Sequence, residues 1–265
     1  SWVPRLDRAL TNPTMIEAVL RPYLNAFRRE LGLPRISRIF HSWAHSPDLV
    51  IGMFPDWFAP VQPDWPSHTH LTGFPLYDEV HDAALPAAVE QFLQTHPRPL
   101  VATPGSANKH GRSFLSEAAK AAQQLGRPAI FLTRYPEQLP PSLPKSIQHF
   151  AYVPLSRLLP HCAALIHHGG IGTCSQAMQA GVPQLIQPLA FDQFDNAART
   201  VKLGIGSMIA GRSFRTPLIV RTLQALWSSP ENAQRCRQTA RRLAKTQGLS
   251  LACETVQTRL INGIR

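Results

Sequence analysis

The sequence predicts an α/β fold with a Rossmann-like, doubly wound parallel sheet, and two observations carry that prediction. From residue 99 to about residue 245, short apolar runs alternate with segments of helical periodicity. Strands that alternate with helices lie parallel in one sheet, because each right-handed crossover returns the chain in the same direction. Glycines also follow two of the apolar runs, in TPGSAN (103–108) and HHGGIG (167–172). Such loops are typical of the ligand-binding edge of a doubly wound sheet.

The elements of this domain follow from the positions of the apolar residues. Five strands are expected, each a short run rich in apolar residues, at 99–103, 128–133, 146–153, 163–168 and 183–188. Three helices are expected at 111–125, 173–180 and 191–203. We therefore assign residues 99–245 to one ligand-binding domain and residues 246–265 to a C-terminal helix.

The first 72 residues offer fewer elements. A helix is expected to begin at Asn12 and Pro13, an N-cap acceptor followed by a residue suited to the first helical position, and to end at Gly32. Pro22 is expected to kink it, and residues 48–54 are expected to form a buried strand. One helix and two strands are too few for a complete α/β domain, so residues 1–72 look like the tail of another domain. Residues 73–98, interrupted by glycine and prolines, are the expected linker.

The composition is that of a globular protein with no membrane span. Hydrophobic residues make up 44% of the chain, and no apolar run approaches the roughly 20 residues that cross a bilayer. The four cysteines show no CxxC pairing, so the sequence favours neither a zinc site nor a disulfide framework. The chain begins SWVPRLD, without an initiator Met or a signal-like segment, as a stretch cut from a longer protein would. We expect a cytoplasmic location.

The net charge of +11 indicates an anionic partner. Nucleic acid, anionic lipid and phosphorylated small molecules are the candidates, and a plain solvated basic surface is the alternative. Arginines 235, 237, 241 and 242 lie in one helical stretch, but no RNA-binding signature or interleaved aromatic residues accompany them. The sequence therefore disfavours nucleic acid and leaves peripheral association with the inner membrane surface open.

The loop at 167–172 has the chemistry of an anion site. Its glycines let the backbone approach a ligand, and the following helix, expected to start near Gly172 or Thr173, points free N–H groups and its positive dipole end at it. The spacing is neither that of a dinucleotide fingerprint nor that of a P-loop. His168 stands directly before the glycines, where its ring can donate to a phosphate oxygen. We expect a diphosphate here, with a tight turn without a ligand as the alternative.

A second loop of the same kind follows the strand at 99–103. It places Gly105, Ser106 and Ala107 at the carboxyl end of that strand, so two loops can face one diphosphate. The alternative is a Pro-Gly turn in which Ser106 serves as a helix N-cap.

Beyond these loops, a longer run resembles a known family. The 55 residues YVPLSRLLPHCAALIHHGGIGTCSQAMQAGVPQLIQPLAFDQFDNAARTVKLGIG (152–206) resemble the donor-binding signature of the family 1 nucleotide-sugar glycosyltransferases of GT-B fold. The resemblance implies that residues 99–245 bind the donor and that residues 1–72 are the C-terminal part of the acceptor-binding domain. It also implies inverting, metal-independent transfer of a hexose-type sugar to an acceptor hydroxyl, without a cofactor. The family's general base lies in a region with no counterpart here; His41, His45, His68 and His70 do not match its context, so we expect donor binding without transfer.

The resemblance also implies roles for single residues. Tyr152 would stack on the nucleotide base and the Val153 backbone would bind the base edge, although Leu155 stands where the family often has Gln. Ser106, His168 and the backbones of Gly170, Gly172 and Thr173 would hold the diphosphate, whereas His167 would lie in the core or behind the site. An ordinary strand-end core aromatic is the alternative for Tyr152.

Two further positions concern the sugars of the donor. Gln176 falls where the family usually has a glutamate that accepts hydrogen bonds from both ribose hydroxyls. A neutral amide loses the preference for two O–H donors, so we expect dTDP rather than UDP. Asp192 and Gln193 match the acidic-Gln pair that binds the transferred sugar, and Asp192 can also be the N-cap of the helix at 191–203.

Among subfamilies, the motifs resemble bacterial enzymes that use activated deoxysugars, including rhamnosyltransferases with lipid acceptors. Three other functions stay open at this point. One is a GT-B nucleotide-sugar epimerase, although the loop offers His, Gly and Thr rather than carboxylates. The second is a non-catalytic nucleotide-sugar-binding module. The third, an NAD-dependent dehydrogenase, is disfavoured by the missing GxGxxG fingerprint.

Overall fold

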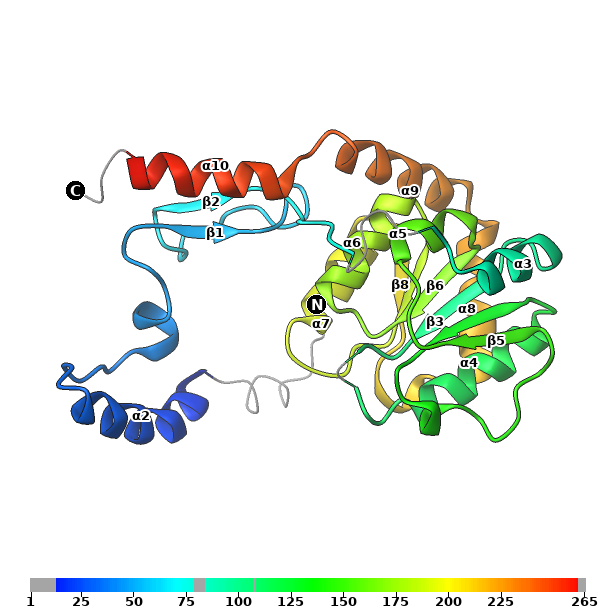
Figure 1. Cartoon of the computed structure of the whole chain (residues 1–265), viewed down its shortest axis with the longest axis horizontal. Helices are drawn as coiled ribbons and strands as arrows, with labels where there is room; N and C mark the ends of the chain where they lie inside the picture. The colour runs from blue at the N-terminus through cyan, green and yellow to red at the C-terminus, as the bar shows by residue number, and fades with distance from the viewer. Residues whose placement is uncertain (1–12, 79–83, 107, 262–265) are drawn as a thin grey trace. The chain divides into compact units, whose positions relative to one another are not determined.

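A computed structural model describes residues 13–78, 84–106 and 108–261, and it divides the chain into two units (Figure 1). Unit 2 is Gly73–Leu249, and unit 1 combines Ser1–Thr72 with Ser250–Arg265. The predicted ligand-binding domain lies in unit 2.

Unit 2 contains one sheet of six parallel strands in the order β5-β4-β3-β6-β7-β8, which confirms the predicted fold class. The strands are β3 (Leu100–Thr103), β4 (Ala129–Leu132), β5 (Ile147–Phe150), β6 (Ala164–His167), β7 (Gln184–Ile186) and β8 (Gly206–Met208). The first five lie within the predicted ranges, and β8 was not predicted. The chain starts in the middle of the sheet, runs outward to β5 and returns to place β6 beside β3. This is the doubly wound order of a Rossmann-like sheet.

Helices cover both faces of this sheet (Figure 1). They are α3 (Ala87–Thr95), α4 (Arg112–Gln124), α5 (Leu155–Leu158), α6 (Ile171–Ala180), α7 (Gln193–Lys202), α8 (Thr216–Ser228) and α9 (Pro230–Leu243), with short turns η2 (Pro136–Gln138), η3 (Leu159–His161) and η4 (Gly211–Ser213). The predicted helices at 111–125, 173–180 and 191–203 correspond to α4, α6 and α7. The range expected as a linker contains α3.

Alternate residues of the central strands belong to two different cores. Leu100 and Ala102 of β3 pack with residues of α4 and α8, while Val101 between them packs with residues of α3, α5 and α6. This alternation is the two-residue period of a strand with both faces buried. It fixes the register of β3 and β6, and hence the position at which their loops emerge.

Unit 1 holds the helix α2 (Pro13–Glu30), the short π-helix η1 (Ile39–Trp43) and a parallel pair of strands, β1 (Val50–Gly52) and β2 (Thr69–Leu71). The helix α10 (Gly248–Ile261) contributes its residues from Ser250 onward. The predicted helix and the predicted strand at 48–54 are present, although the strand is shorter; the predicted N-cap Asn12 lies outside the described residues. None of the helices in the described ranges has the length and apolar character needed to cross a membrane.

Candidate functional site

The candidate site lies where the strand order of unit 2 reverses. β3 and β6 are neighbours, and Thr103 pairs in register with His167, so both strands end at the same level. The chain leaves β3 toward β4 on one side and leaves β6 toward β7 on the other. Ligands of open α/β sheets bind in the crevice at this point. The two glycine loops of the sequence therefore emerge side by side.

The His168 ring is packed between the two loops. A Cβ atom on Gly105 would lie 2.7 Å from Cε1 of His168, and a Cβ atom on Gly170 would lie 2.5 Å from its Nε2. Both distances are too short for a side chain. Gly105 also has a φ of +97°, a conformation that other residues rarely adopt. The structure thus brings Gly105, His168 and Gly170 close together.

His168 carries an unused hydrogen-bonding atom. Its Nδ1 is buried, and no partner reaches this atom among the described residues. Burial lowers the pKa of His168, and the nearby Asp192 carboxylate opposes that shift without cancelling it. The ring is therefore neutral near pH 7. A bound anion would favour the protonated ring, which can donate through both nitrogens.

The helix α6 begins three residues after this histidine. Gly170 is its N-cap and Ile171 its first residue, so the helix starts one to two residues before the predicted position. The first N–H groups of a helix have no partner within the helix and carry the positive end of its dipole. A Cβ on Gly172 would meet no atom within 4 Å, and Gly172 is exposed. The N-terminus of α6 is thus accessible to an anion.

His167 supports the loop from behind. It is fully buried, its Nδ1 accepts a hydrogen bond from the Gly169 N–H at 3.2 Å, and its Nε2 lies 3.0 Å from Oε1 of Gln184. Since Nδ1 accepts, the hydrogen must be on Nε2, which donates to Gln184. Burial, with a smaller contribution from the neighbouring His168, lowers the pKa of His167 to about 3. This neutral ring lies behind the site, as predicted, and holds the turn at Gly169.

Gln176 lies deep in unit 2. It is 4% exposed, and its Nε2 donates to the backbone oxygen of Tyr77 at 3.3 Å and to Oδ1 of Asp78 at 3.4 Å. Its Oε1 is another buried atom that no partner reaches within the described part of the chain. Sequence reasoning missed Asp78, because it lies 98 residues away in a segment with no recognisable motif.

Asp192 and Gln193 stand at the start of α7, close to the loop of Gly169. Asp192 occupies the N-cap position, but its side chain makes no cap hydrogen bond, so the predicted capping role is wrong. Its Oδ2 instead accepts a hydrogen bond from Asn196 at 2.8 Å, and the same Asn196 amide donates to the Gly169 oxygen at 3.0 Å. Gln193 accepts hydrogen bonds from the Leu189 and Ala190 N–H groups. Asp192 itself is exposed.

The remaining predicted residues lie at the same edge of the sheet. Tyr152 follows β5 and is 37% exposed, so the alternative of a core aromatic is wrong, whereas the Val153 side chain is buried. Ser106 is exposed, and the N-cap of α4 is Gly111, so Ser106 does not cap that helix. Thr173 lies in the first turn of α6.

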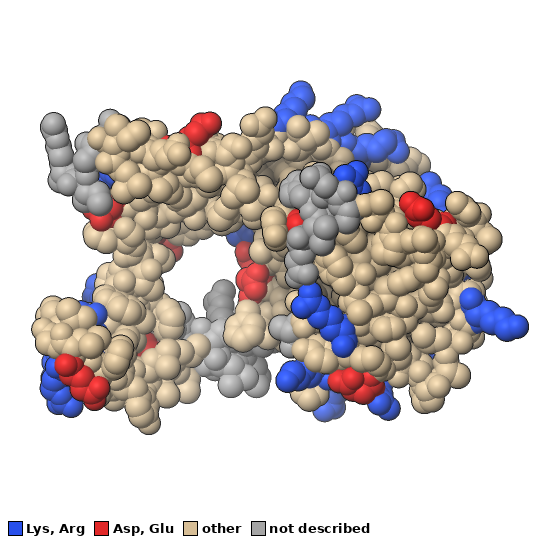
Figure 2. All heavy atoms as spheres, in the orientation of Figure 1, with Lys and Arg blue, Asp and Glu red and all other residues tan. Residues whose placement is uncertain are grey.

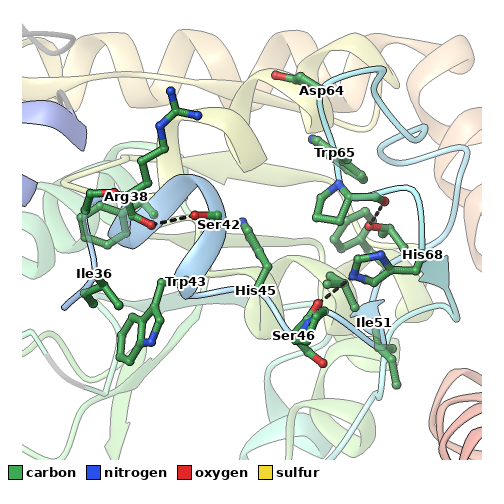
Figure 3. Close-up of a pocket in the computed structure, with 18 of the residues that line it drawn as sticks. Ile36, Arg38, Ser42, Trp43, His45, Ser46, Ile51, Asp64, Trp65 and His68 are labelled. Carbon is green, nitrogen blue, oxygen red and sulfur yellow. Dashed lines mark hydrogen bonds between the residues drawn. The ribbon is translucent and has the colours of Figure 1, made fainter. Parts of the chain in front are cut away.

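Unit 1 contains a separate pocket of about 1170 Å³. Its lining includes four aromatic side chains, Phe40, Trp43, Phe54 and Trp65. Figure 3 shows η1 with Ser42 and Trp43 on one side and Trp65 and His68 on the other. His68 is held by a 2.7 Å hydrogen bond between its Nε2 and the Ser46 oxygen. An apolar compound with rings fits such a lining.

The structure adds two facts about metals and cysteines. Within the described ranges, no group of three His, Cys, Asp or Glu side chains is arranged to hold a metal ion. The four cysteines are all free, and three of them are buried.

Comparison with known proteins places these features in a family context. A family model described as "Erythromycin biosynthesis protein CIII-like, C-terminal domain" matches residues 130–254. The chain is 30% identical over 246 residues to O-mycaminosyltylonolide 6-deoxyallosyltransferase of Streptomyces fradiae, and the match covers 89% of this chain and 56% of that protein. The chain therefore spans about half the length of this curated relative.

Solved structures show the same fold. The glycotransferase of kitacinnamycin is similar with a TM-score of 0.77 at 21% identity, covering 98% of this chain and 68% of that one. Spinosyn rhamnosyltransferase SpnG, in a structure complexed with thymidine diphosphate, is similar with a TM-score of 0.68 at 21% identity, covering 88% of this chain and 60% of that one. These structures share the fold of this chain, and the roles assigned to single residues stay predictions.

Proposed function

We propose that this chain, whose C-terminal portion is that of a family 1 glycosyltransferase of GT-B fold, holds the nucleotide-sugar donor of an inverting, metal-independent sugar transfer. The observation that carries the proposal is the His168 ring between Gly105 and Gly170, with a buried unpartnered Nδ1 beside the N-terminus of α6. An imidazole and a helix N-terminus at one point are suited to a diphosphate.

The same groups would act in the reaction. When the bond between the sugar and the diphosphate breaks, negative charge develops on the leaving phosphate oxygens. His168 and the first N–H groups of α6 would stabilise that charge, since they are fixed in place before the reaction. We propose that the transfer needs no metal ion, because these N–H donors would stabilise the charge on the leaving phosphate. Tyr152 would hold the base, and Asp192 with Gln193 would contact the transferred sugar.

The nucleotide is proposed to be dTDP in preference to UDP. Gln176 offers one free oxygen, because its nitrogen is engaged by Tyr77 and Asp78. One acceptor suits the single free hydroxyl of a deoxyribose better than the hydroxyl pair of a ribose. The thymidine diphosphate complex of SpnG is consistent with this choice. We propose a deoxysugar such as rhamnose as the transferred group, because the sequence motifs resemble enzymes that use activated deoxysugars.

The acceptor is proposed to be a small or lipidic alcohol. The aromatic lining of the unit 1 pocket favours an apolar compound with rings. The general base that removes the proton from the acceptor hydroxyl is proposed to lie outside these 265 residues, which match 56% of the S. fradiae relative. By themselves they are expected to bind donor without transferring sugar.

Calorimetric titration of the chain with dTDP, UDP and NAD at one salt concentration tests the proposal. We expect micromolar binding of dTDP, with UDP at least tenfold weaker, a difference of about 1.4 kcal/mol, and no binding of NAD. Equal affinities for dTDP and UDP would remove the deoxyribose preference. A chain that binds neither nucleotide would overturn the donor-binding function.

A further inference from the structure

Asp78 joins two parts of the proposed nucleoside site. Its Oδ2 accepts a hydrogen bond from the Ser156 N–H at 3.0 Å, and its Oδ1 accepts one from Nε2 of Gln176 at 3.4 Å. Ser156 lies four residues after Tyr152, the residue proposed to hold the base. The carboxylate of Asp78 thus links α5, which follows Tyr152, to Gln176 of α6.

These contacts determine which way the Gln176 amide faces. The atom of the Gln176 amide that faces residues 77 and 78 lies near two oxygens, those of the Tyr77 carbonyl and the Asp78 carboxylate. An amide oxygen in that position would oppose both of them, whereas an amide nitrogen can donate to both. Nε2 must therefore face Asp78, and Oε1 must face the other way.

The Oε1 atom is left without a donor. It belongs to a side chain that is 4% exposed, and within the described residues it has no hydrogen-bond partner. A buried acceptor without a partner is costly, so a ligand hydroxyl that donates to it would bind favourably. The 3′-hydroxyl of a deoxyribose is such a donor.

We propose that Asp78 is a positioning residue of the nucleotide site, which orients the Gln176 amide so that its Oε1 accepts the 3′-hydroxyl of the bound nucleotide. This inference rests on the proposed function, because it assumes that the site takes a nucleoside diphosphate. In this proposal, Asp78 determines whether Gln176 presents its amide oxygen, an acceptor, or its amide nitrogen, a donor, to the pentose.

Mutation can exchange the donor and the acceptor of the hydrogen bond between Gln176 and Asp78. In Asp78→Asn, the new amide can still accept from Ser156, but its nitrogen then opposes Nε2 of Gln176, and the fixed orientation of Gln176 is lost. In Gln176→Glu, a second carboxylate opposes that of Asp78. The double variant Asp78→Asn/Gln176→Glu again pairs a donor with an acceptor and again presents an oxygen to the pentose, although the hydrogen bond to the Tyr77 oxygen is given up.

The experiment measures dissociation constants for dTDP and for its 3′-deoxy analogue with the 265-residue chain and these three variants. The wild type is expected to bind dTDP roughly three- to tenfold more tightly than the analogue, as one hydrogen bond contributes. In Asp78→Asn and in Gln176→Glu this ratio is expected to fall toward one, and in the double variant to return. Asp56→Asn, an exposed aspartate of unit 1, is the matched control and should keep the wild-type ratio.

The outcomes separate this inference from the function on which it rests. An unchanged ratio in Asp78→Asn, or a double variant that stays at a ratio near one while folded by circular dichroism, would overturn the role of Asp78 and leave dTDP binding intact. A wild-type chain that binds dTDP no better than its analogue would overturn the role of Gln176 Oε1. Absence of any dTDP binding by the wild type would overturn the proposed function itself.

Discussion

His167 and His168 are adjacent in the sequence but lie in different environments. The His168 ring lies against the two glycine loops with an unpartnered Nδ1, whereas the His167 ring is fully buried and hydrogen-bonded at both nitrogens. The direction of each side chain follows from its position at the end of β6. His167 is the last residue of the strand and is part of the sheet, and His168 is the first residue of the loop.

The buried His167 predicts how stability depends on pH. Its pKa is about 3 in the folded chain against 6.5 for an ordinary histidine, so between these values the unfolded chain binds a proton that the folded chain does not. Stability must therefore fall as the pH falls below 6.5, by up to about 1.4 kcal/mol per pH unit from this residue. Urea unfolding of the wild type and of His167→Gln between pH 7 and pH 4.5 measures this contribution.

We expect His167→Gln to be less stable at pH 7 but to lose less stability on acidification. His161→Gln, which changes an exposed histidine before β6, should keep the wild-type slope. Equal slopes for the wild type and His167→Gln would show that His167 is not the group that titrates.

At the residue scale, the sequence predicted the residues of the two glycine loops better than the residues that hold those loops in place. Gly105, His168 and Gly170 lie in loops that directly follow strands, so their meeting follows from strand order alone. Asp78, Gln184 and Asn196 act through contacts with residues far along the chain. Nothing local distinguishes their carboxylate or amide from any other, and the structure was needed to find them.

At the scale of elements, helix α7 is tied to the loop before α6. The amide nitrogen of Asn196 has two hydrogens, which it gives to the Gly169 oxygen at 3.0 Å and to Oδ2 of Asp192 at 2.8 Å. One side chain thus sets the position of a proposed sugar-binding carboxylate relative to the proposed diphosphate loop.

Removing the Asn196 amide should weaken binding of the transferred sugar more than binding of the nucleotide. In Asn196→Ala, we expect the affinity for a dTDP-sugar to fall about fivefold, near 1 kcal/mol for a lost hydrogen bond, with a smaller change for dTDP. Titration with dTDP and dTDP-rhamnose gives both values. Asn232→Ala is the control, because Asn232 is also buried and donates to the Gly204 oxygen, away from Gly169. If Asn196→Ala lost equal affinity for both ligands, Asn196 would not act by positioning Asp192 for the sugar.

The predicted elements were those with a strong apolar pattern. β3, β4, β6 and β7 are buried on both faces and read as apolar runs, and α4 has a clear helical period. β8 has three residues, Gly-Ser-Met, with no such run, and its place comes from pairing with β7. The helix α3 lies between prolines in a segment that resembles a linker, and Val89 and Phe92 bury it against the sheet.

At the scale of the whole molecule, the basic charge predicted an anionic partner without locating it. Figure 2 shows Lys and Arg side chains spread over the visible surface, with a group over α9. The candidate site has a different source of positive potential, the N-terminus of α6, and a bound anion would also raise the pKa of His168 and favour its protonated form. Net charge alone therefore could not have identified the loops that follow β3 and β6 as the candidate site.

The sequence also indicated that the chain has two parts. Unit 2 has a complete sheet with both faces covered, whereas α2 of unit 1 exposes apolar side chains, among them Met15, Val19, Tyr23 and Phe27. The periodicity of these residues predicted the helix correctly, because periodicity reports which residues share a face. It does not report what lies against that face.

We have proposed that the loops following β3 and β6 hold a diphosphate through His168. The most direct test is the dissociation constant of dTDP for the wild type, for His168→Gln and for the control His161→Gln, at pH 7 and one salt concentration. Loss of a charge-assisted hydrogen bond should weaken binding by about ten- to a hundredfold in His168→Gln, with no change in His161→Gln. If His168→Gln binds dTDP as tightly as the wild type, the nucleotide does not bind through His168 and the account is contradicted.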